Sequence, residues 1–459
     1  MKLAVIGAGW AGLSAALQAT RLGHHVTVFE ASRTLGGRAR AVPVSYTHGT
    51  QEHHWLLDNG QHILIGAYSQ TLALMQCVGT PGTDLLRTPL TLLYPDGQGL
   101  RCPDLSRFAT NSIATQQILS LLEVVLGITR LPWRLSERWA LIARAMRWRQ
   151  QQFTCAPNLS VADICEGLPQ RVLEEFIEPL CVSALNTPPS KASAQVFLRV
   201  LQDALLGTAA QDAQAWGLPS HMLLPRTDLG HLFPERAAQA LVQAGAKLHT
   251  GVRAQLAYAK QGHTPQGWQV QGEDFDQVIL ATSASDAVKL LDAAKQDAPE
   301  NIAHYIQCWQ HITQALAYEP IATVYAYAPE ARLRAPMLAL HSSAEHPAQF
   351  VFDRGQLQSD PADTQHGLLA FVVSASRGDA ATLQAQVLNQ ARAQLGLELT
   401  PVKTLVEKRA TFACTPGLQR PCATVAPGLI ACGDYIAGPY PATLEGAVRS
   451  GLHAVDLLS

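Results

Sequence analysis

The feature that most constrains the fold of this chain is a glycine-rich segment near its start, LAVIGAGWAG at residues 3–12. A short apolar strand leads into the glycines, and a helix over 11–22 follows them. In this pattern Gly7 makes the tight turn, Gly9 lets a pyrophosphate approach the backbone, and Gly12 lets the helix pack against its strand. Phosphates then lie at the helix N-terminus, where free N–H groups and the helix dipole favour negative charge. The expected phosphate contacts are Gly7, Gly9, Ala11 and Gly12.

The residues after this helix extend the nucleotide-binding pattern. A strand over 26–29 ends in Glu30, about where a carboxylate accepts hydrogen bonds from ribose hydroxyls and repels a 2′-phosphate. The sequence therefore disfavours NADP at this site. The pair Gly36-Gly37 predicts a second close backbone approach, and Arg38 offers a guanidinium to the pyrophosphate.

A second segment near the other end of the chain, IACGDYIAGPYPATLEGA at 430–447, repeats this logic. It predicts an apolar strand, the pair Gly433-Asp434, a turn, and a helix that begins near Thr443. Two anchors at opposite chain ends favour FAD, because this long cofactor needs a second contact for its flavin end. The free N–H groups of Thr443 and Leu444 are then expected to face the flavin N1/O2 edge, and Asp434 to accept from a ribityl or phosphate-side hydroxyl.

The segment over 7–40, GAGWAGLSAALQATRLGHHVTVFEASRTLGGRAR, resembles the N-terminus of FAD-dependent amine oxidases and phytoene-type desaturases. Within that superfamily, four further segments are similar to the hydroxysqualene dehydroxylases. These are LDNGQHILIGAY at 57–68, LNTPP at 185–189, EKRATF at 407–412 and PATLEGAVRSG at 441–451. One departure is Cys-Gly-Asp-Tyr at 432–435, where Ala-Gly-Asp-Trp is more usual, and both changes keep the size and aromatic character.

The resemblance implies an α/β fold, in which a Rossmann-like FAD-binding domain carries an inserted α+β substrate domain and a helical subdomain. It places the backbone of Val252 at the adenine and the loop with Gly60 and Gln61 near the isoalloxazine. The implied reaction is reductive removal of the hydroxyl of hydroxysqualene, an apolar C30 isoprenoid, with an external electron donor for the flavin. His62 and Tyr440 are the candidate catalytic residues, because a proton donor near the flavin would help the hydroxyl leave.

Composition narrows the class of protein. A chain of 459 residues with 47% hydrophobic and 15% charged residues predicts a well-buried globular protein of two or three domains. The formal net charge of −2 gives no reason to expect nucleic-acid binding. Nine scattered cysteines without a CxxC pair indicate thiols in a reducing cytoplasm, and we expect neither disulfides nor a metal site.

Hydrophobic periodicity predicts how the chain is divided. We expect a discontinuous FAD-binding domain over 1–88, 225–300 and 405–459, a helical segment over 89–224 and a strand-rich substrate segment over 301–404. Within the helical segment, six arginines, three tryptophans and one glutamate occur over 130–149. Arginine interleaved with tryptophan on an amphipathic helix is typical of the headgroup layer. We therefore expect 112–152 to contact an anionic membrane surface, and the protein to be cytoplasmic and peripheral at the inner face of the membrane.

Other functions share these patterns. A carotenoid desaturase has the same fold and differs in the redox state of the flavin during turnover. An amine oxidase would usually have an aromatic cage and often a catalytic lysine, and no segment of this sequence indicates either one. A prenyl-binding protein without catalysis requires that FAD be absent.

Overall fold

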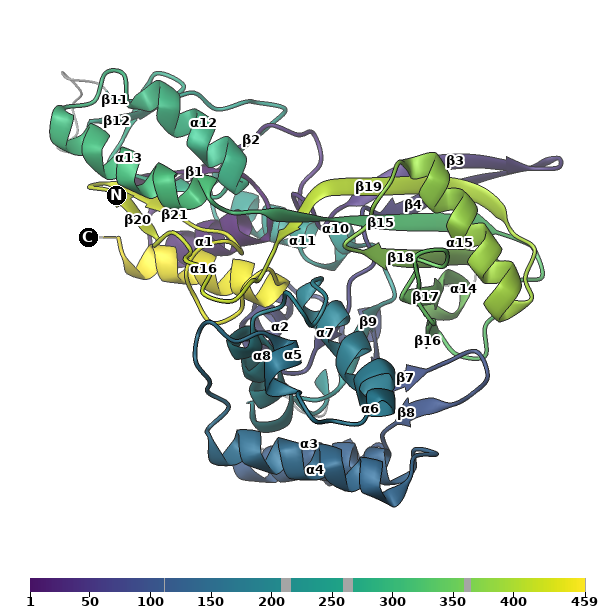
Figure 1. Ribbon diagram of the computed structural model, residues 1–459. Coiled ribbons are helices and arrows are strands. Elements are labelled where there is room, and N and C mark those ends of the chain that lie inside the picture. Colours follow the sequence, from purple (N-terminus) through teal and green to yellow (C-terminus); the bar gives the residue numbers. More distant parts are fainter. Residues whose placement is uncertain (111, 208–215, 259–266, 359–364, 459) are drawn as a thin grey trace.

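The computed structural model describes residues 1–110, 112–207, 216–258, 267–358 and 365–458. In Figure 1 this part of the chain forms three regions, which are a layered sheet near both chain ends, a long antiparallel sheet, and a group of helices at the lower edge of the view. The mixed architecture confirms the predicted α/β class. Among the described residues, no helix combines the length and apolar character needed to cross a membrane.

The first region is built on a six-stranded sheet whose strands come from both ends and the middle of the chain. The strand order is β10 (Lys247–Thr250), β2 (His25–Glu30), β1 (Lys2–Ile6), β14 (Gln277–Leu280), β21 (Leu429–Ala431) and β20 (Thr424–Ala426). All neighbours pair in parallel except β20, which is antiparallel to β21. Ile6 lies opposite Phe29 and Leu280, so the carboxyl ends of three strands meet at one edge. Nucleotides bind at this edge of such sheets.

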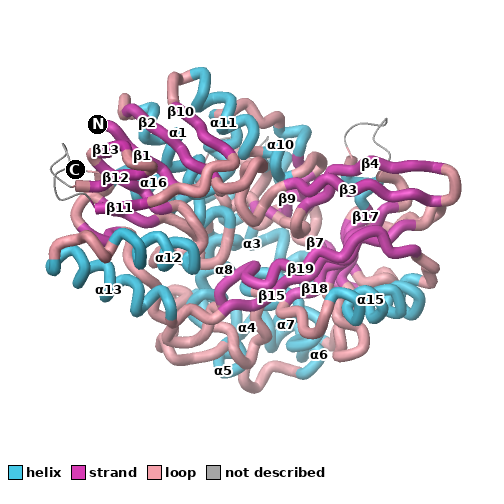
Figure 2. The backbone as a smooth tube through the Cα atoms, turned by 90° about the horizontal axis from the view of Figure 1, so that it is seen from above, coloured by secondary structure: helices cyan, strands magenta, loops and turns pink. Residues whose placement is uncertain are grey.

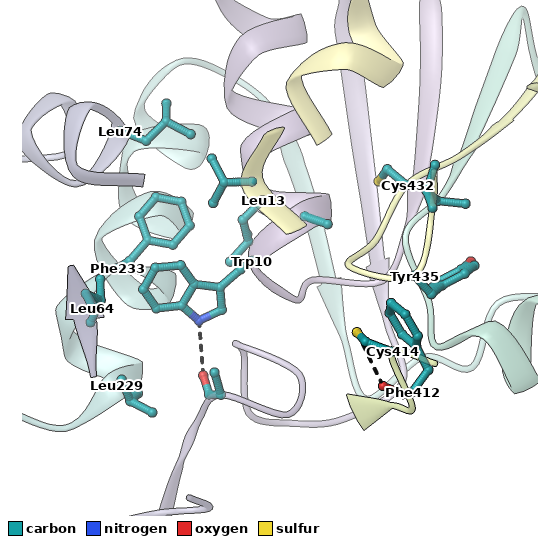
Figure 3. Packing of buried hydrophobic residues seen from close by; sticks show 14 of the residues in the cluster. Trp10, Leu13, Leu64, Leu74, Leu229, Phe233, Phe412, Cys414, Cys432 and Tyr435 are labelled. Carbon is teal, nitrogen blue, oxygen red and sulfur yellow. Dashed lines mark hydrogen bonds between the residues drawn. The ribbon is translucent and has the colours of Figure 1, made fainter. Parts of the chain in front are cut away.

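Helices cover this sheet and fix the glycine-rich turn. They are α1 (Trp10–Arg21), α2 (Ser69–Cys77), α10 (Leu229–Leu232), α11 (Pro234–Gln243), α12 (Ala284–Ala294), α13 (Glu300–Gln314) and α16 (Leu444–Asp456). A Cβ on Gly451 would lie 2.2 Å from the Ala11 carbonyl oxygen, so glycine lets α16 cross α1 closely. Trp10 packs on Phe233 with ring centroids 4.8 Å apart and donates to the Ala39 carbonyl at 3.2 Å (Figure 3). These contacts hold the start of α1 against the core.

The second region is an antiparallel sheet with α15 (Ala380–Leu395) beside it. Its order is β16 (Met337–Ala339), β17 (Phe350–Asp353), β18 (Leu368–Ser374), β15 (Tyr318–Tyr327) and β19 (Thr400–Phe412). The hairpin of β3 (Ala41–His48) and β4 (Gln51–Asp58) extends beside this sheet in Figure 2. A separate small sheet contains β11 (Leu256–Tyr258), β12 (Trp268–Val270) and β13 (Glu273–Phe275). The strands β15, β16, β17 and β18 all lie within 301–404, which the sequence predicts to be rich in strands.

The third region is mainly helical. Its helices are α3 (Ile113–Thr129), α4 (Leu135–Gln150), α5 (Val161–Ile164), α6 (Gln170–Val172), α7 (Glu178–Leu185) and α8 (Ala194–Leu206), with a π-helical turn over Leu173–Ile177. Two small sheets adjoin them. One is the hairpin of β7 (Thr91–Leu93) and β8 (Gly99–Arg101), and the other contains β5 (Leu64–Ile65), β9 (Met222–Pro225) and β6 (Leu85–Thr88).

The elements differ from the sequence-based division at two points. The boundary at 301 falls inside α13, which packs on α12 of the first region. The boundary at 405 falls inside β19, because β19 pairs with β15 from Thr400 opposite Tyr327 to Phe412 opposite Tyr318. The division into domains itself stays a prediction.

Candidate active site

The glycine-rich turn has the geometry that the sequence predicts. Gly7 has φ +110°, and a Cβ there would lie 2.5 Å from the Ala281 carbonyl oxygen. A Cβ on Gly12 would lie 2.0 Å from the Gly7 carbonyl oxygen, so the helix packs directly on the turn. Around Gly9, by contrast, the nearest atom to such a Cβ is the Gly37 Cα at 3.9 Å. The packing of the protein itself therefore requires glycine at positions 7 and 12, whereas Gly9 borders open space of the kind that a pyrophosphate needs. We call this glycine-rich turn the nucleotide cradle.

The Glu30 carboxylate lies at the end of β2 and is held by the backbone. One oxygen accepts from the Ala8 N–H and the other from the Ser32 N–H, both at 2.7 Å. The Glu30 carbonyl accepts from the Val252 N–H at 2.9 Å, so the two residues predicted at the ribose and the adenine are neighbours. Each carboxylate oxygen keeps a second lone pair for a ribose hydroxyl.

Arg38 and Asp434 form an ion pair that joins the two ends of the chain. Arg38 also donates to the Ala410 carbonyl at 2.5 Å, and Asp434 raises the pKa of the guanidinium. Gly36 and Gly37 place Arg38 here with φ +97° and +64°. The sequence assigned Arg38 to the pyrophosphate and Asp434 to a hydroxyl, and both assignments stay predictions. The structure adds that the two side chains fix each other's position.

The start of α16 is the second predicted contact with the cofactor, after the glycine-rich turn. Thr443 caps the helix, since its Oγ1 accepts from the Gly446 N–H at 2.9 Å and donates to the Tyr440 carbonyl at 3.0 Å. The preceding Ala442 has φ +58°, a conformation that a residue with a Cβ rarely adopts. Leu444 is the first residue of the helix. Thr443 therefore serves stability through its side chain, while the N–H groups at this terminus stay the predicted flavin contact.

Glu445 is a buried carboxylate next to the site that the sequence reasoning missed. Its buried carboxylate accepts from the Gln70 and Thr71 N–H groups at 3.1 and 2.9 Å and from the Thr71 hydroxyl at 2.7 Å. Arg449 neutralises it with a contact of 2.6 Å. Glu445 thus joins α16 to the start of α2. The only sequence signal was its place in the segment 441–451.

The loop after β4 brings Gly60, Gln61 and His62 to the same cavity. The Gln61 side chain is fully engaged, because its Nε2 donates to the Tyr325 hydroxyl at 2.9 Å and its Oε1 accepts from Arg354 at 3.1 Å. The backbone of the loop, rather than the Gln61 amide, is therefore the part free to meet a flavin.

His62 is in contact with its own loop. Its Nδ1 lies 2.7 Å from the Gly60 carbonyl oxygen, which has no proton to give, so Nδ1 carries the hydrogen. Burial, together with the charge of Arg38, lowers the pKa of His62 from its usual value near 6.5, although the Gly60 bond opposes this. A neutral His62 presents a lone pair at Nε2. It delivers a proton only after Nε2 has first taken one up.

Two tyrosines lie beside the start of α16. Tyr440 lies between two guanidiniums, with Arg449 at 4.8 Å and Arg199 at 5.3 Å from its ring centroid. Tyr68, which the sequence reasoning missed, also lines the cavity. Burial raises the pKa of both phenols, so both stay protonated and able to donate a hydrogen bond at neutral pH.

A single cavity of about 1160 Å³ connects these groups. This exceeds the roughly 300–1,000 Å³ of most ligand pockets. At one end lie the glycine-rich turn, Glu30 and Val252; at the other end lie apolar side chains of the helical region, namely Val124, Ile128, Leu141, Trp148, Phe176 and Leu180. Apart from Gly12, which packs on Gly7, the predicted FAD residues thus line one cavity. The glycine-rich turn, the Glu30 carboxylate and the helix terminus fit FAD.

One group of side chains outside the expected site has metal-ligand chemistry. The buried Glu123 and His221 lie 3.1 Å apart, with Asp104 close by. The Glu123 oxygens also accept from the Leu105 N–H at 2.7 Å and the Ser220 hydroxyl at 3.2 Å. These hydrogen bonds account for the carboxylate without an ion, and they anchor α3 to the segment before β9.

The family model described as flavin containing amine oxidoreductase matches residues 10–459. The hydroxysqualene dehydroxylase of Sinorhizobium fredii is 26% identical over 99% of this chain and 97% of its own length. That of Rhodopseudomonas palustris is 25% identical over 99% and 97%. An oxidoreductase structure from Methanosarcina mazei superposes with a TM-score of 0.70 at 16% identity, covering 99% of this chain and all (100%) of that one, which shows a shared fold.

Proposed function

Because the chain belongs to the family of flavin-containing amine oxidoreductases, we propose that this FAD-dependent enzyme removes the hydroxyl group of hydroxysqualene reductively, to give squalene. The full-length likeness to two hydroxysqualene dehydroxylases supports this substrate. The structural observation that carries the proposal is the continuity of the cavity from the nucleotide cradle to apolar helices. A C30 hydrocarbon chain needs such an apolar space next to the cofactor.

The reaction replaces a C–O bond with a C–H bond. The alcohol is allylic, so the hydroxyl leaves as water once it is protonated, and the remaining cation is stabilised by resonance. Reduced FAD, when bound, supplies the hydride that forms the new C–H bond. One proton and one hydride are thus consumed per squalene and water formed, and an external two-electron donor must reduce the flavin again.

The protein has three tasks in this scheme. The apolar walls around Val124 and Phe176 exclude water that would otherwise capture the cation. The terminus of α16 favours negative charge on the reduced cofactor. Tyr68, Tyr440 and protonated His62 line the cavity and are candidates to give a proton to the leaving hydroxyl.

The test is anaerobic reaction of the photoreduced enzyme with hydroxysqualene, followed by flavin absorbance and product extraction. We expect oxidation of the flavin with one squalene formed per flavin. Phytoene is the comparison substrate, offered to the oxidised enzyme. Reduction of the oxidised flavin by phytoene, without oxidation of the reduced flavin by hydroxysqualene, would instead establish a desaturase.

We further propose that α3 and α4 rest on an anionic membrane surface from which the substrate is taken. The outward side of these helices carries large exposed apolar side chains, namely Ile113, Ile118, Leu122, Leu135, Trp139 and Met146. Exposed arginines accompany them, namely Arg130, Arg134, Arg147 and Arg149. The inward side of the same two helices lines the cavity. The helices also lie at the edge of the molecule in Figure 1.

The residues that support this surface are only in part those that the sequence singles out. Trp133 and Trp148 are buried, at 4% exposure each, so the expectation that they face headgroups is wrong. The helical period shows that apolar residues share a face but not which face is buried. Arg138 and Arg144 donate to backbone carbonyls of the protein and are partly buried.

Sedimentation with anionic liposomes tests the surface. We expect a variant with Ile118→Ser, Trp139→Ser and Met146→Ser to stay in the supernatant under conditions that sediment the wild type, because apolar insertion is lost. The matched control changes Val242 and Tyr305, which are as exposed but lie on other helices. Each basic residue near the surface contributes about 1 kcal/mol, so wild-type binding should weaken with salt. Equal sedimentation of variant and wild type would refute the proposal.

A further inference from the structure

A buried arginine lies behind the loop that carries His62. Arg354, the first residue of α14 (Arg354–Leu357), is 2% exposed. Its Nη1 donates to Gln61 Oε1 and its Nε to Gln365 Oε1, both at 3.1 Å. A cation this deep is unfavourable unless it is paired and hydrogen-bonded. Its contacts with the loop therefore need an explanation beyond packing.

A tyrosine holds the other end of the Gln61 amide. Tyr325, fully buried in β15, accepts from Gln61 Nε2 at 2.9 Å and donates to the Asp58 carbonyl at 2.8 Å. Arg354 thus fixes the amide oxygen and Tyr325 the amide nitrogen. The Gln61 side chain has one orientation that satisfies both, and the backbone of the loop follows it.

The anion that balances this charge is Asp58, the last residue of β4 directly before the loop. The Asp58 carboxylate is 2% exposed and lies 4.0 Å from Arg354 Nη1. Its other oxygen accepts from the Leu229 N–H at 2.7 Å. Burial raises the pKa of Asp58 to about 6, and Arg354 acts against this shift. Both ends of the loop segment 58–62 are therefore tied to the arginine, one through charge and the other through the Gln61 amide.

We propose that Arg354 is a positioning residue that, through Gln61 and together with Tyr325, sets the loop bearing Gly60 and His62 against the reacting end of the cavity. The inference rests on the proposed function for its rate assay and on FAD binding for its spectral assay. The side-chain hydrogen bonds and the ion pair of Arg354 reach neither the glycine-rich turn nor the helices α3 and α4. Its effect is therefore expected on the reaction and on the flavin environment, not on FAD retention.

A double-mutant cycle between Arg354→Lys and Gln61→Met tests this pathway. Lysine keeps a charge opposite Asp58 but lacks the planar fork that reaches both glutamines. We expect Arg354→Lys to slow single-turnover oxidation of reduced flavin by about 10-fold or more, as small displacements of reacting groups do, with FAD content unchanged. In the Gln61→Met background the same change should slow the reaction by less than about 2-fold, because coupled residues are not additive. Visible circular dichroism of the bound flavin should change in Arg354→Lys.

Arg226→Lys is the matched control. Arg226 donates to the Leu357 and Gln358 carbonyls at 3.3 Å, beside the same short helix, and these side-chain hydrogen bonds do not reach the loop. It should leave the rate and the flavin spectrum unchanged. If Arg354→Lys does not fold, Tyr325→Phe replaces it in the cycle, with the same expected coupling to Gln61→Met.

Two results would overturn the inference. Rate losses of Arg354→Lys and Gln61→Met that multiply independently would show that the arginine does not act through the amide. A flavin spectrum identical to wild type, together with a rate loss matched by lost FAD or lost thermal stability, would make the residue merely structural. If the wild type itself leaves hydroxysqualene unreacted, the proposed function fails, whereas the circular dichroism of the variants still decides the inference.

Discussion

Replacement of Glu30 by alanine should weaken FAD binding and should also lower the free energy of unfolding of the flavin-free protein. The sequence assigns Glu30 only to the ribose. The structure shows that the carboxylate also holds the Ala8 N–H of the glycine-rich turn and the Ser32 N–H after β2, each at 2.7 Å. The Glu30 carboxylate thus stabilises the glycine-rich turn in the flavin-free protein as well.

The magnitude follows from these contacts. A hydrogen bond to a charged group contributes about 1.5–3 kcal/mol, but water can replace part of it because Glu30 is partly exposed. We therefore expect the flavin-free Glu30→Ala protein to lose about 1–3 kcal/mol of stability. Loss of the ribose bond should weaken FAD by a further ~10- to 100-fold. Glu30→Gln should fall between, since its amide keeps one acceptor and opposes the other N–H.

The assay is titration of the flavin-free protein with FAD, followed by flavin fluorescence, together with urea unfolding of the same preparation. Glu273→Ala is the control, because Glu273 is half exposed and pairs with Lys2 at 2.8 Å on the surface. Such pairs contribute about 0–1 kcal/mol, and this one lies away from the cradle. An FAD dissociation constant within about threefold of wild type in Glu30→Ala would refute the ribose assignment. An unchanged urea midpoint would refute the structural role.

Further predictions concern the reaction and the packing of the cradle. If His62 gives the proton, single-turnover oxidation of reduced flavin should speed up as the pH falls through the lowered pKa of His62, below 6.5, because only the protonated ring donates. His62→Ala should slow this oxidation by about 10²–10⁴-fold. A wild-type rate that does not depend on pH would count against His62 as the donor. Tyr440→Phe should have the smaller effect in the same stopped-flow assay. Gly12→Ala should yield colourless protein, since its Cβ would lie 2.0 Å from the Gly7 carbonyl oxygen, and a yellow product would contradict this. Glu445→Ala should lower stability by about 2–5 kcal/mol by leaving N–H groups unpaired, and an unchanged thermal midpoint would contradict it.

The cradle could be predicted from sequence because its rules are local. Gly7 is a glycine for its positive φ, and Gly12 for the distance of α1 from the turn, and both requirements act within a few residues. Glu30 could be predicted because it is the last residue of the strand after the first helix, which is where a carboxylate reaches the ribose in this type of fold. For such residues, the spacing along the chain already determines the geometry.

The rest of the site depends on partners far away in the chain. Glu445 binds Thr71 across 374 residues, and Arg354 binds Gln61 across 293. No local pattern marks either pair, because each is set by how sheets and helices pack. The same limit explains Trp148, whose helix is amphipathic in sequence but whose buried side is decided by the cavity beneath it.

The ion pair of Arg38 and Asp434 suggests how the cofactor would stabilise the folded protein. These residues are 396 positions apart, and they meet where the first and last segments of the chain enclose the same cavity. A ligand that contacts both segments binds only when they are together, so it stabilises the native state by mass action. Because Glu30 and Thr443 lie on opposite segments of this enclosure, FAD should raise the thermal midpoint of the wild type more than that of a variant lacking the ion pair. Arg38→Met is that variant, and an equal FAD-induced shift in both proteins would show that the cofactor does not use this junction.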